Sequence, residues 1–247
     1  MESEYVGAYG ALYREHWWWR VRERILLARI RALLGRRAGS ARILDIGCGA
    51  GLFFDALATL GHVEGIETEE AAVNQSGRWR SHIHLGSLED YEPIAPFDVV
   101  LLLDVVEHIE TPLSFLRRVP GLVAPWGHVI ITVPAFDWLW TSHDDLNHHC
   151  HRYTTNELRR LIDGSGMHTL EARYLFQSLV VPKLAMRAKE AVVGAVAAIP
   201  RVPPPALNDA LQTWFRLEHA VAGWLPFGGS VMAVASLPRP RSEATAP

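Results

Sequence analysis

Short apolar runs alternate with segments of helical pattern along this chain. The apolar runs predict seven strands, at residues 42–46, 62–67, 82–85, 97–104, 127–133, 168–174 and 230–237. Helical spacing and capping residues predict helices at residues 11–34, 52–60, 69–76, from 111 onward, 155–163 and 206–225. This alternation predicts an α/β fold with a doubly wound, largely parallel sheet.

The ends of the predicted strands indicate where a ligand binds. Residues 97–104, FDVVLLLD, form a continuous apolar run, which is typical of a central strand buried on both faces. Ligands of doubly wound sheets bind beyond the carboxyl ends of the strands. Three strands end there in an acid: Asp45, Glu67 and Asp104. A purely structural set of acids would not favour the same end of three strands, so we expect a binding site at this edge.

The most informative motif follows the first strand, in the segment RILDIGCGAG at 42–51. Three glycines stand there at alternate positions: Gly47, Gly49 and Gly51. Glycines let the backbone approach a ligand closely, and Glu67, 22 positions after Asp45, is placed to accept hydrogen bonds from ribose hydroxyls. A dinucleotide fingerprint would have its third glycine at position 52, which is Leu52. The pattern favours a nucleoside cofactor without a phosphate, and the alternative is a tight turn that binds nothing.

Composition narrows the class of protein. The 247 residues suit one α/β domain with additions. The net charge of −3 and the lack of a basic stripe indicate no nucleic-acid partner. Cys48 and Cys150 form no recognisable disulfide framework, the N-terminus lacks an apolar signal core, and the apolar stretch at 191–199 is too short to span a membrane. We therefore expect a cytoplasmic protein.

Residues 42–167 resemble the class I methyltransferases that use S-adenosylmethionine (SAM), in the broad subgroup of ubiquinone-biosynthesis and natural-product enzymes. The motifs that carry the resemblance are ILDIGCGAG, GIE, GSLED, FDVVLLLDVVEHIETP and GHVIITVP. It implies seven strands with the last antiparallel, and SAM as cofactor with S-adenosylhomocysteine (SAH) as product. The segments HWWWRVR, VPAFDWLWTSHDDLNHHCHRYT and PFGGSVMAVA resemble an uncharacterised bacterial subgroup, which adds no substrate. Cys150 and His151 replace arginines frequent in that subgroup and are poor candidates for an essential role.

The resemblance also implies positions that bind the cofactor. They are Asp45, Gly47, Cys48, Gly49, Gly51, Glu67, Thr68, Ser87, Leu88, Asp104, Val105 and His108. Glu67 would hold the ribose hydroxyls, and Ser87 and Leu88 would flank the adenine. Asp104 and Val105 would line the methionine side, while the histidine of VVEHIE either lies near the cofactor or braces its loop.

A segment after the fifth strand is rich in histidine: His143, His148, His149 and His151. One interpretation is a hydrogen-bonded loop in which Asp144 and Asp145 cap backbone groups. A second makes His149 or His143 the general base, or an orienting donor, for an alcohol or phenol acceptor. A third is a metal site of His143, Asp144 and His149, but their spacing matches no standard ligand pattern, and we predict no metal.

The N-terminal helix carries a row of bulky side chains, His16, Trp17, Trp18 and Trp19. Either its Trp face packs over the sheet, or the helix is a lid that closes the cofactor cleft, as in related methyltransferases. In the lid interpretation the acceptor contacts include His16, Trp17, Trp18 and Tyr153. Arg22 or Arg20 would pair with the SAM carboxylate, or would be a solvated arginine.

Residues 177–229 form an insertion before the last strand. Its apolar face predicts a helical cap, a substrate pocket, a membrane-surface helix or a dimer face, and its few lysines weaken the membrane interpretation. We divide the chain into a lid (1–40), a SAM-binding core (41–175), a helical cap (176–229) and the last strand with its tail (230–247). The expected function is O-methylation of a small, lipid-like or glycan-type acceptor, and the alternatives are a nicotinamide-dependent oxidoreductase and a non-catalytic SAM-binding module.

Overall fold

One mixed sheet organises the molecule. The computed structural model describes residues 10–74, 77–194 and 200–238. Within them, the seven strands have the order β3-β2-β1-β4-β5-β7-β6. Their bounds are β1 (Ala41–Ile46), β2 (Gly61–Glu67), β3 (Ile83–Leu85), β4 (Phe97–Leu103), β5 (Val123–Pro134), β6 (His168–Leu175) and β7 (Ser230–Ser236). The pairs among β1 to β5 are parallel and β7 is antiparallel to β5 and β6, which confirms the predicted doubly wound sheet and its reversed last strand.

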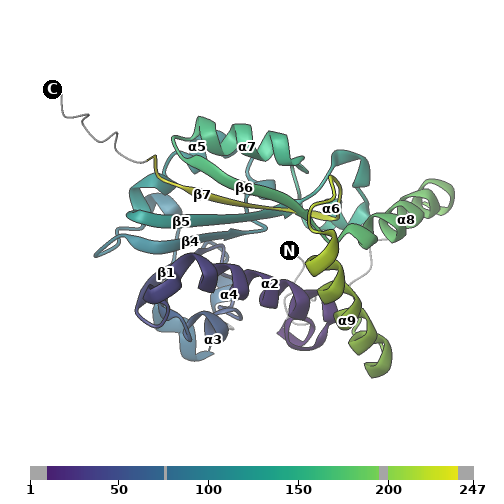
Figure 1. Ribbon diagram of the computed structural model, residues 1–247, viewed down its shortest axis with the longest axis horizontal. Coiled ribbons are helices and arrows are strands. Elements are labelled where there is room, and N and C mark those ends of the chain that lie inside the picture. Colours follow the sequence, from purple (N-terminus) through teal and green to yellow (C-terminus); the bar gives the residue numbers. More distant parts are fainter. Residues whose placement is uncertain (1–9, 75–76, 195–199, 239–247) are drawn as a thin grey trace.

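Helices cover both faces of the sheet (Figure 1). α5 (Pro112–Leu116) and α7 (Thr155–Gly164) lie on one face, and α2 (Trp17–Leu34), α3 (Phe54–Leu57) and α4 (Glu70–Asn74) lie on the other. Along β4, Val100 and Leu102 belong to the first hydrophobic cluster, whereas Val99 and Leu101 belong to the second. The alternation confirms that this apolar run is a central strand buried on both faces.

The insertion before β7 is helical, with α8 (Val180–Val193) and α9 (Pro205–Ala222). Both helices extend from the end of the sheet at which α6 (Ser142–Leu146) lies (Figure 1). α9 packs against α2, where the rings of Trp17 and Phe215 stack with centroids 4.6 Å apart. None of the described helices combines the length and the apolar character that a membrane span needs. Part of the apolar stretch at 191–199 lies outside the described residues, as do the first nine residues and the tail after 238.

Three local predictions need correction. The predicted helix 11–34 is interrupted at His16, whose Nδ1 accepts a hydrogen bond from the Trp18 amide and caps α2. The predicted helix 52–60 is α-helical only over Phe54–Leu57, because the flanking turns use i to i+3 hydrogen bonds. The histidine-rich segment contains a short helix, α6, because Thr141 and Asp144 form a capping box.

Short 3₁₀ turns complete the described structure. They span Gly35–Arg37, Gly77–His82, Leu88–Asp90, Val106–His108, Val119–Leu122, Asp137–Leu139 and Gln177–Leu179. The turn after β4 places Glu107 and His108 at the carboxyl edge of the sheet, next to the loop that follows β1.

Candidate active site

The glycine loop follows β1 in a conformation that side chains rarely adopt. The φ angles of its three glycines are positive, at 73°, 55° and 66° for Gly47, Gly49 and Gly51. A Cβ on Gly47 would lie 2.6 Å from Cγ2 of Val105, so the loop packs directly on the turn after β4. A Cβ on Gly49 would meet no atom within 4 Å. The loop therefore leaves bare backbone beside open space at Gly49.

The Glu67 carboxylate joins the ends of β1 and β2. Its Oε2 accepts a hydrogen bond from the Gly49 amide at 2.8 Å, and its Oε1 accepts from the amides of Thr68 and Glu69 at 2.8 and 2.9 Å. The Gly86 amide donates to the Glu67 carbonyl at 2.9 Å, which brings the segment after β3 to the same edge. There Leu88 is buried, and the Ser87 hydroxyl bonds to Asp90. The structure thus brings the glycine loop and the acid together.

A pocket lies between this loop and α2. The residues that line it are Tyr13, Trp19, Arg22, Glu23, Leu26, Asp45, Gly47, Cys48, Leu52, Phe53 and Leu103. Its volume is about 60 Å³, whereas sites that hold small molecules usually measure roughly 300–1,000 Å³. The N-terminal helices form one wall, so a shift of α2 would enlarge the pocket.

Burial controls the charges of the pocket. It raises the pKa of Asp45 to about 7, an effect that Arg22 opposes and Glu67 increases. It also raises the pKa of the Cys48 thiol, with Asp45 and Glu67 adding to the shift. The raised pKa keeps the Cys48 thiol neutral, and this side chain lines the pocket.

Arg22 reaches from α2 across to the end of β4. Its Nη2 lies 2.7 Å from Oδ2 of Asp104 and 2.9 Å from Oγ1 of Thr132. Asp104 has a φ of 58°, an uncommon conformation for a residue with a side chain, and the Thr132 hydroxyl donates to its Oδ1 at 2.9 Å. Asp104 and Thr132 thus fix the guanidinium at the pocket wall.

The histidine-rich segment is organised around one fully buried acid, Asp144. Arg152 donates to both of its oxygens at 2.8 Å, through Nε and Nη2, and His149 Nδ1 lies 2.8 Å from Oδ1. Burial alone would raise the pKa of Asp144, but the hydrogen bonds of His149 and Arg152 outweigh it and hold this pKa below its ordinary value. An ionised carboxylate only accepts hydrogen bonds, so Nδ1 of His149 donates to it, and in the neutral ring the lone pair is then on Nε2.

A second buried acid, Glu107, lies in the turn after β4. It is fully buried, and neither carboxylate oxygen has a hydrogen-bond partner among the described residues. Burial, and then the charge of Asp104, raise the pKa of Glu107 well above its ordinary value. Its carbonyl accepts hydrogen bonds from the amides of Cys150 and His151 at 2.6 and 3.4 Å. The turn after β4 and the histidine-rich segment are therefore tied together through Glu107.

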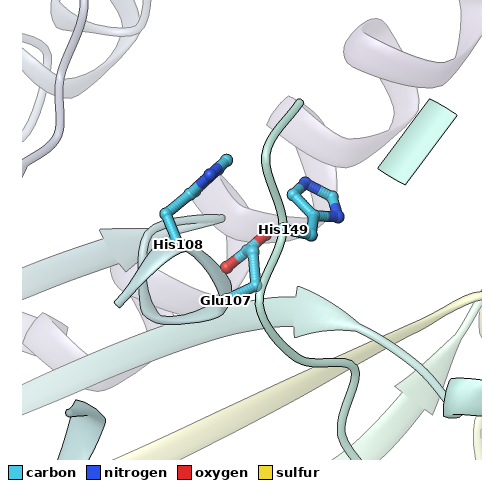
Figure 2. Close-up of side chains that lie close together, drawn as sticks. All are labelled: Glu107, His108 and His149. Carbon is cyan, nitrogen blue, oxygen red and sulfur yellow. The ribbon is translucent and has the colours of Figure 1, made fainter. Parts of the chain in front are cut away.

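Figure 2 shows Glu107, His108 and His149 gathered where these two segments meet. One ligand atom from each side chain lies within 4.8 Å of those of the other two. The rings of His108 and His149 are 4.8 Å apart between centroids and nearly perpendicular, at 79°. The alternative metal set of His143, Asp144 and His149 is not supported, because Arg152 occupies both oxygens of Asp144.

The residues predicted to contact the acceptor have different environments. His143 is half-buried, and burial together with the charge of Lys183 on α8 lowers its pKa. Trp17 is buried against α9, and its amide donates to Oδ1 of Asn208 at 2.8 Å, which makes it a packing residue. The hydroxyl of buried Tyr153 donates to the Val106 carbonyl at 3.5 Å and supports the turn after β4.

His16 and Trp18 are not among the residues that line the pocket, but they contact Trp19 and Arg22, which are. His16 caps α2, and the Trp18 ring lies 5.4 Å from the Arg22 guanidinium carbon. Trp19 lines the pocket, although it was predicted only as one of the bulky side chains of the helix and not as a site residue. Its spacing with Arg22, Glu23 and Leu26 follows one helical face and could have identified it.

Comparison with known proteins identifies the family. Residues 18–172, more than half of the chain, match the family described as "Methyltransferase domain". The chain is 32% identical over 107 residues to a ubiquinone biosynthesis O-methyltransferase of Bradyrhizobium diazoefficiens, covering 40% of this chain and 42% of that protein. It is 42% identical over 101 residues to a protein of the same name from Maricaulis maris, covering 36% of this chain and 39% of that protein. These alignments span about two fifths of each relative's length.

A solved structure supports the same fold. A SAM-dependent methyltransferase from Archaeoglobus fulgidus superposes with a TM-score of 0.55 at 15% identity, over 86% of this chain and 93% of that one. The strand order and the antiparallel β7 agree with this likeness. The chain therefore belongs to the methyltransferase-domain family and has the fold of the class I SAM-dependent methyltransferases.

Proposed function

We propose that this protein transfers a methyl group from SAM to an oxygen of a small or lipid-like acceptor. The observation that carries the proposal is the Asp144–His149 pair at the carboxyl edge of a methyltransferase fold. His149 lies in the segment tied to the turn after β4, and that turn packs on the glycine loop. A site for the cofactor and an oriented imidazole thus adjoin one another.

The glycine loop, Glu67 and the residues that line the pocket would suit SAM. The bare backbone at Gly49 lets a ligand approach, and a Cβ there would occupy the open space. Glu67 has lone pairs beyond its three amide bonds with which to accept ribose hydroxyls. Asp45 would face the ammonium of the cofactor and Arg22 its carboxylate. SAM supplies a methyl group on a sulfonium, whose leaving group is neutral.

The N-terminal helix would act as the lid of this pocket. Trp19, Arg22 and Leu26 of α2 line the small cavity, so the helix would open to admit the cofactor. Once closed, the apolar wall excludes water from the reacting atoms.

His149 would activate the acceptor. An alcohol or phenol must lose a proton as its oxygen is methylated, and a neutral imidazole can assist this loss. Asp144 fixes the orientation of the ring and its tautomer, while Arg152 keeps Asp144 ionised. His143, half-buried and with a lowered pKa, would be neutral at physiological pH and could receive the proton in place of His149.

Two observations support an oxygen acceptor with an apolar part. The relatives from B. diazoefficiens and M. maris are named O-methyltransferases. The helical insertion near α6 also exposes large apolar side chains, among them Val181, Leu184, Met186, Leu207, Trp214 and Leu217. These side chains would cover the apolar part of an acceptor beside the site.

The test compares His149→Ala with the matched variant His151→Ala, which removes an exposed histidine of the same segment. Labelled SAM is supplied with dihydroxybenzoates and long-chain phenols as acceptors. We expect His149→Ala to lower turnover roughly 100-fold or more while the Kd of SAH changes less than about twofold, and His151→Ala to behave as wild type. Full turnover by His149→Ala would remove it from catalysis, and transfer to nitrogen acceptors alone would overturn the oxygen assignment.

A further inference from the structure

Glu107 is a buried acid whose side chain the cofactor pocket does not use. Both of its carboxylate oxygens are fully buried without a hydrogen-bond partner among the described residues. A buried carboxylate is costly unless a proton, a hydrogen bond, an opposite charge or a metal ion compensates it. The side chains beside it are two imidazoles, His108 and His149 (Figure 2). The carboxylate and the two imidazoles are all groups that can bind a cation.

The three ligand atoms are close enough to bind one ion after a small adjustment. Each pair lies within 4.8 Å. Atoms about 2.1 Å from a common tetrahedral ion are roughly 3.4 Å apart. Rotation of the His108 side chain, which is exposed, can supply the difference. The same exposure gives an ion a route from solvent to the buried carboxylate.

His149 has the support that metal-binding histidines usually have. Such a histidine donates its other ring N–H to a carboxylate, which fixes the ring and its tautomer. Here Nδ1 of His149 lies 2.8 Å from Oδ1 of Asp144, and Asp144 is held in turn by Arg152. The arrangement leaves Nε2 of His149 as the atom able to bind a cation.

The backbone holds the cluster together without an ion. The amides of Cys150 and His151 donate to the Glu107 carbonyl, and the Tyr153 hydroxyl donates to the Val106 carbonyl. These bonds join the turn after β4 to the segment that carries His149. The ligands are therefore brought together by the fold.

We propose that Glu107, His108 and His149 form a site for a divalent first-row transition-metal ion, to which the acceptor binds through its hydroxyl oxygen. Two imidazoles and a carboxylate suit Zn²⁺, Mn²⁺, Fe²⁺ or Co²⁺, whereas Mg²⁺ and Ca²⁺ prefer oxygen ligands only. Three protein ligands leave coordination positions open for the acceptor. The metal site stands on its own geometry, and its role toward the acceptor rests on the proposed function.

A metal ion at this site would change how the acceptor is activated. A hydroxyl bound to a divalent cation loses its proton more readily, and this proton passes to solvent or to His143. The oxygen then forms a bond to the methyl carbon as the bond between that carbon and sulfur breaks, and SAH leaves with the electron pair. With the ion bound, Nε2 of His149 is occupied, so the role of proton acceptor that the proposed function gives to His149 without an ion passes to His143 or to solvent.

The experiment titrates chelator-treated protein with Co²⁺, followed by visible absorption, and with Zn²⁺, followed by calorimetry. Glu107→Gln removes the charge and nearly keeps the shape, and His149→Ala removes a ring. His151→Ala and Cys150→Ser are matched controls that remove other metal-binding groups of the same segment. Thermal unfolding of every variant, with and without Zn²⁺, reports folding and binding together.

We expect one equivalent of Co²⁺ to bind with micromolar or lower Kd and with the absorption of a low-coordinate site. Glu107→Gln and His149→Ala should weaken binding at least 100-fold, and the two controls should leave it within about threefold. Zn²⁺ should raise the Tm of wild type but not that of Glu107→Gln. Metal binding that survives both variants, that needs Cys150, or that is absent from wild type would overturn the site.

The outcome separates this inference from the proposed function. SAH binding to chelator-treated protein tests the cofactor pocket alone. If SAH binds and turnover of a dihydroxybenzoate persists without metal, the metal role is wrong while methyl transfer stands. If metal binds but SAH does not, the proposed function is wrong and the site remains.

Discussion

The two halves of the sheet's carboxyl edge are built in different ways. At the ends of β1 and β2, contacts join backbone amides of the segments after both strands to one carboxylate, that of Glu67. At the ends of β4 and β5, they come from side chains of separate segments, such as Glu107, Asp144 and Arg152. After the roles in the proposed function, we refer to these as the cofactor half and the acceptor half.

The halves also differ in how well their charges are satisfied. Three amides donate to the Glu67 carboxylate, whereas the Glu107 carboxylate has no donor among the described residues. The Glu67 carboxylate is therefore held in place before any ligand binds. A buried acid without a partner needs a proton or a cation, so the acceptor half is the part whose state depends on what binds.

The largest expected effect comes from a substitution that disrupts the acceptor half. Arg152→Met should lower the free energy of unfolding by about 3–5 kcal/mol, because it leaves the buried Asp144 charge without its main partner. Urea unfolding followed by circular dichroism measures it. Arg160→Met, on the exposed face of α7, is the control and should change stability by less than about 0.5 kcal/mol. A loss below about 1 kcal/mol for Arg152→Met would show that this pair does not organise the segment.

The next prediction concerns the cofactor half. Glu67→Ala should weaken SAH binding by about 1–3 kcal/mol, because it removes an ionised acceptor of ribose hydroxyls. Glu69→Ala removes an exposed acid two residues on and should leave the Kd unchanged within about twofold. Calorimetry measures both. An unchanged affinity in Glu67→Ala would remove the ribose assignment.

A series of SAM titrations at different pH values tests the charge of Asp45 in the cofactor half. Its pKa of about 7 means that it is mostly neutral at pH 5.5 and mostly ionised at pH 8. Binding of SAM, whose ammonium it would face, should strengthen up to roughly thirtyfold over this range, because only the ionised fraction is competent. Since this pKa is raised in the folded state, Asp45 stabilises the protein at low pH, and that stability is lost as pH rises from about 4 to 7.

Asp45→Asn is the control for this series. The variant should bind SAM with little pH dependence and should lose the stability change between pH 4 and 7. A SAM affinity that does not vary with pH in wild type would show that Asp45 does not face the cofactor.

The smallest expected effect is the difference in stability between two glycine substitutions in the same loop. Gly47→Ala should cost about 1–2 kcal/mol more unfolding free energy than Gly49→Ala. Both positions have positive φ, but only the new Cβ at Gly47 would meet Val105, at 2.6 Å. Thermal or urea unfolding decides it. Equal losses would mean that the loop moves away from the turn after β4 at little cost.

The cofactor half could be predicted from sequence because its signals are local. The glycine spacing after Asp45 and the position of Glu67 mark one strand–helix–strand unit, and the structure joins Glu67 to Gly49. The apolar run of β4 likewise marked its strand nearly to the residue. Pattern and fold agree where neighbours in sequence are neighbours in space.

The acceptor half could be predicted only in part. The histidine-rich segment was recognised, but nothing in the spacing of Asp144 and Arg152 indicates that they pair, since the chain turns through a left-handed residue, His148, between them. Glu107 was missed because its isolation is a property of tertiary packing. Side-chain sites of this kind become visible only when distant segments are placed together.

The central claim is that the loop after β1 binds SAM. Calorimetric titration of the purified protein with SAH, with NAD and NADP as controls, tests it most directly. We predict micromolar binding of SAH and no binding of either nicotinamide nucleotide. Binding of NAD or NADP without binding of SAH would contradict the account, because the glycine loop would then serve another cofactor.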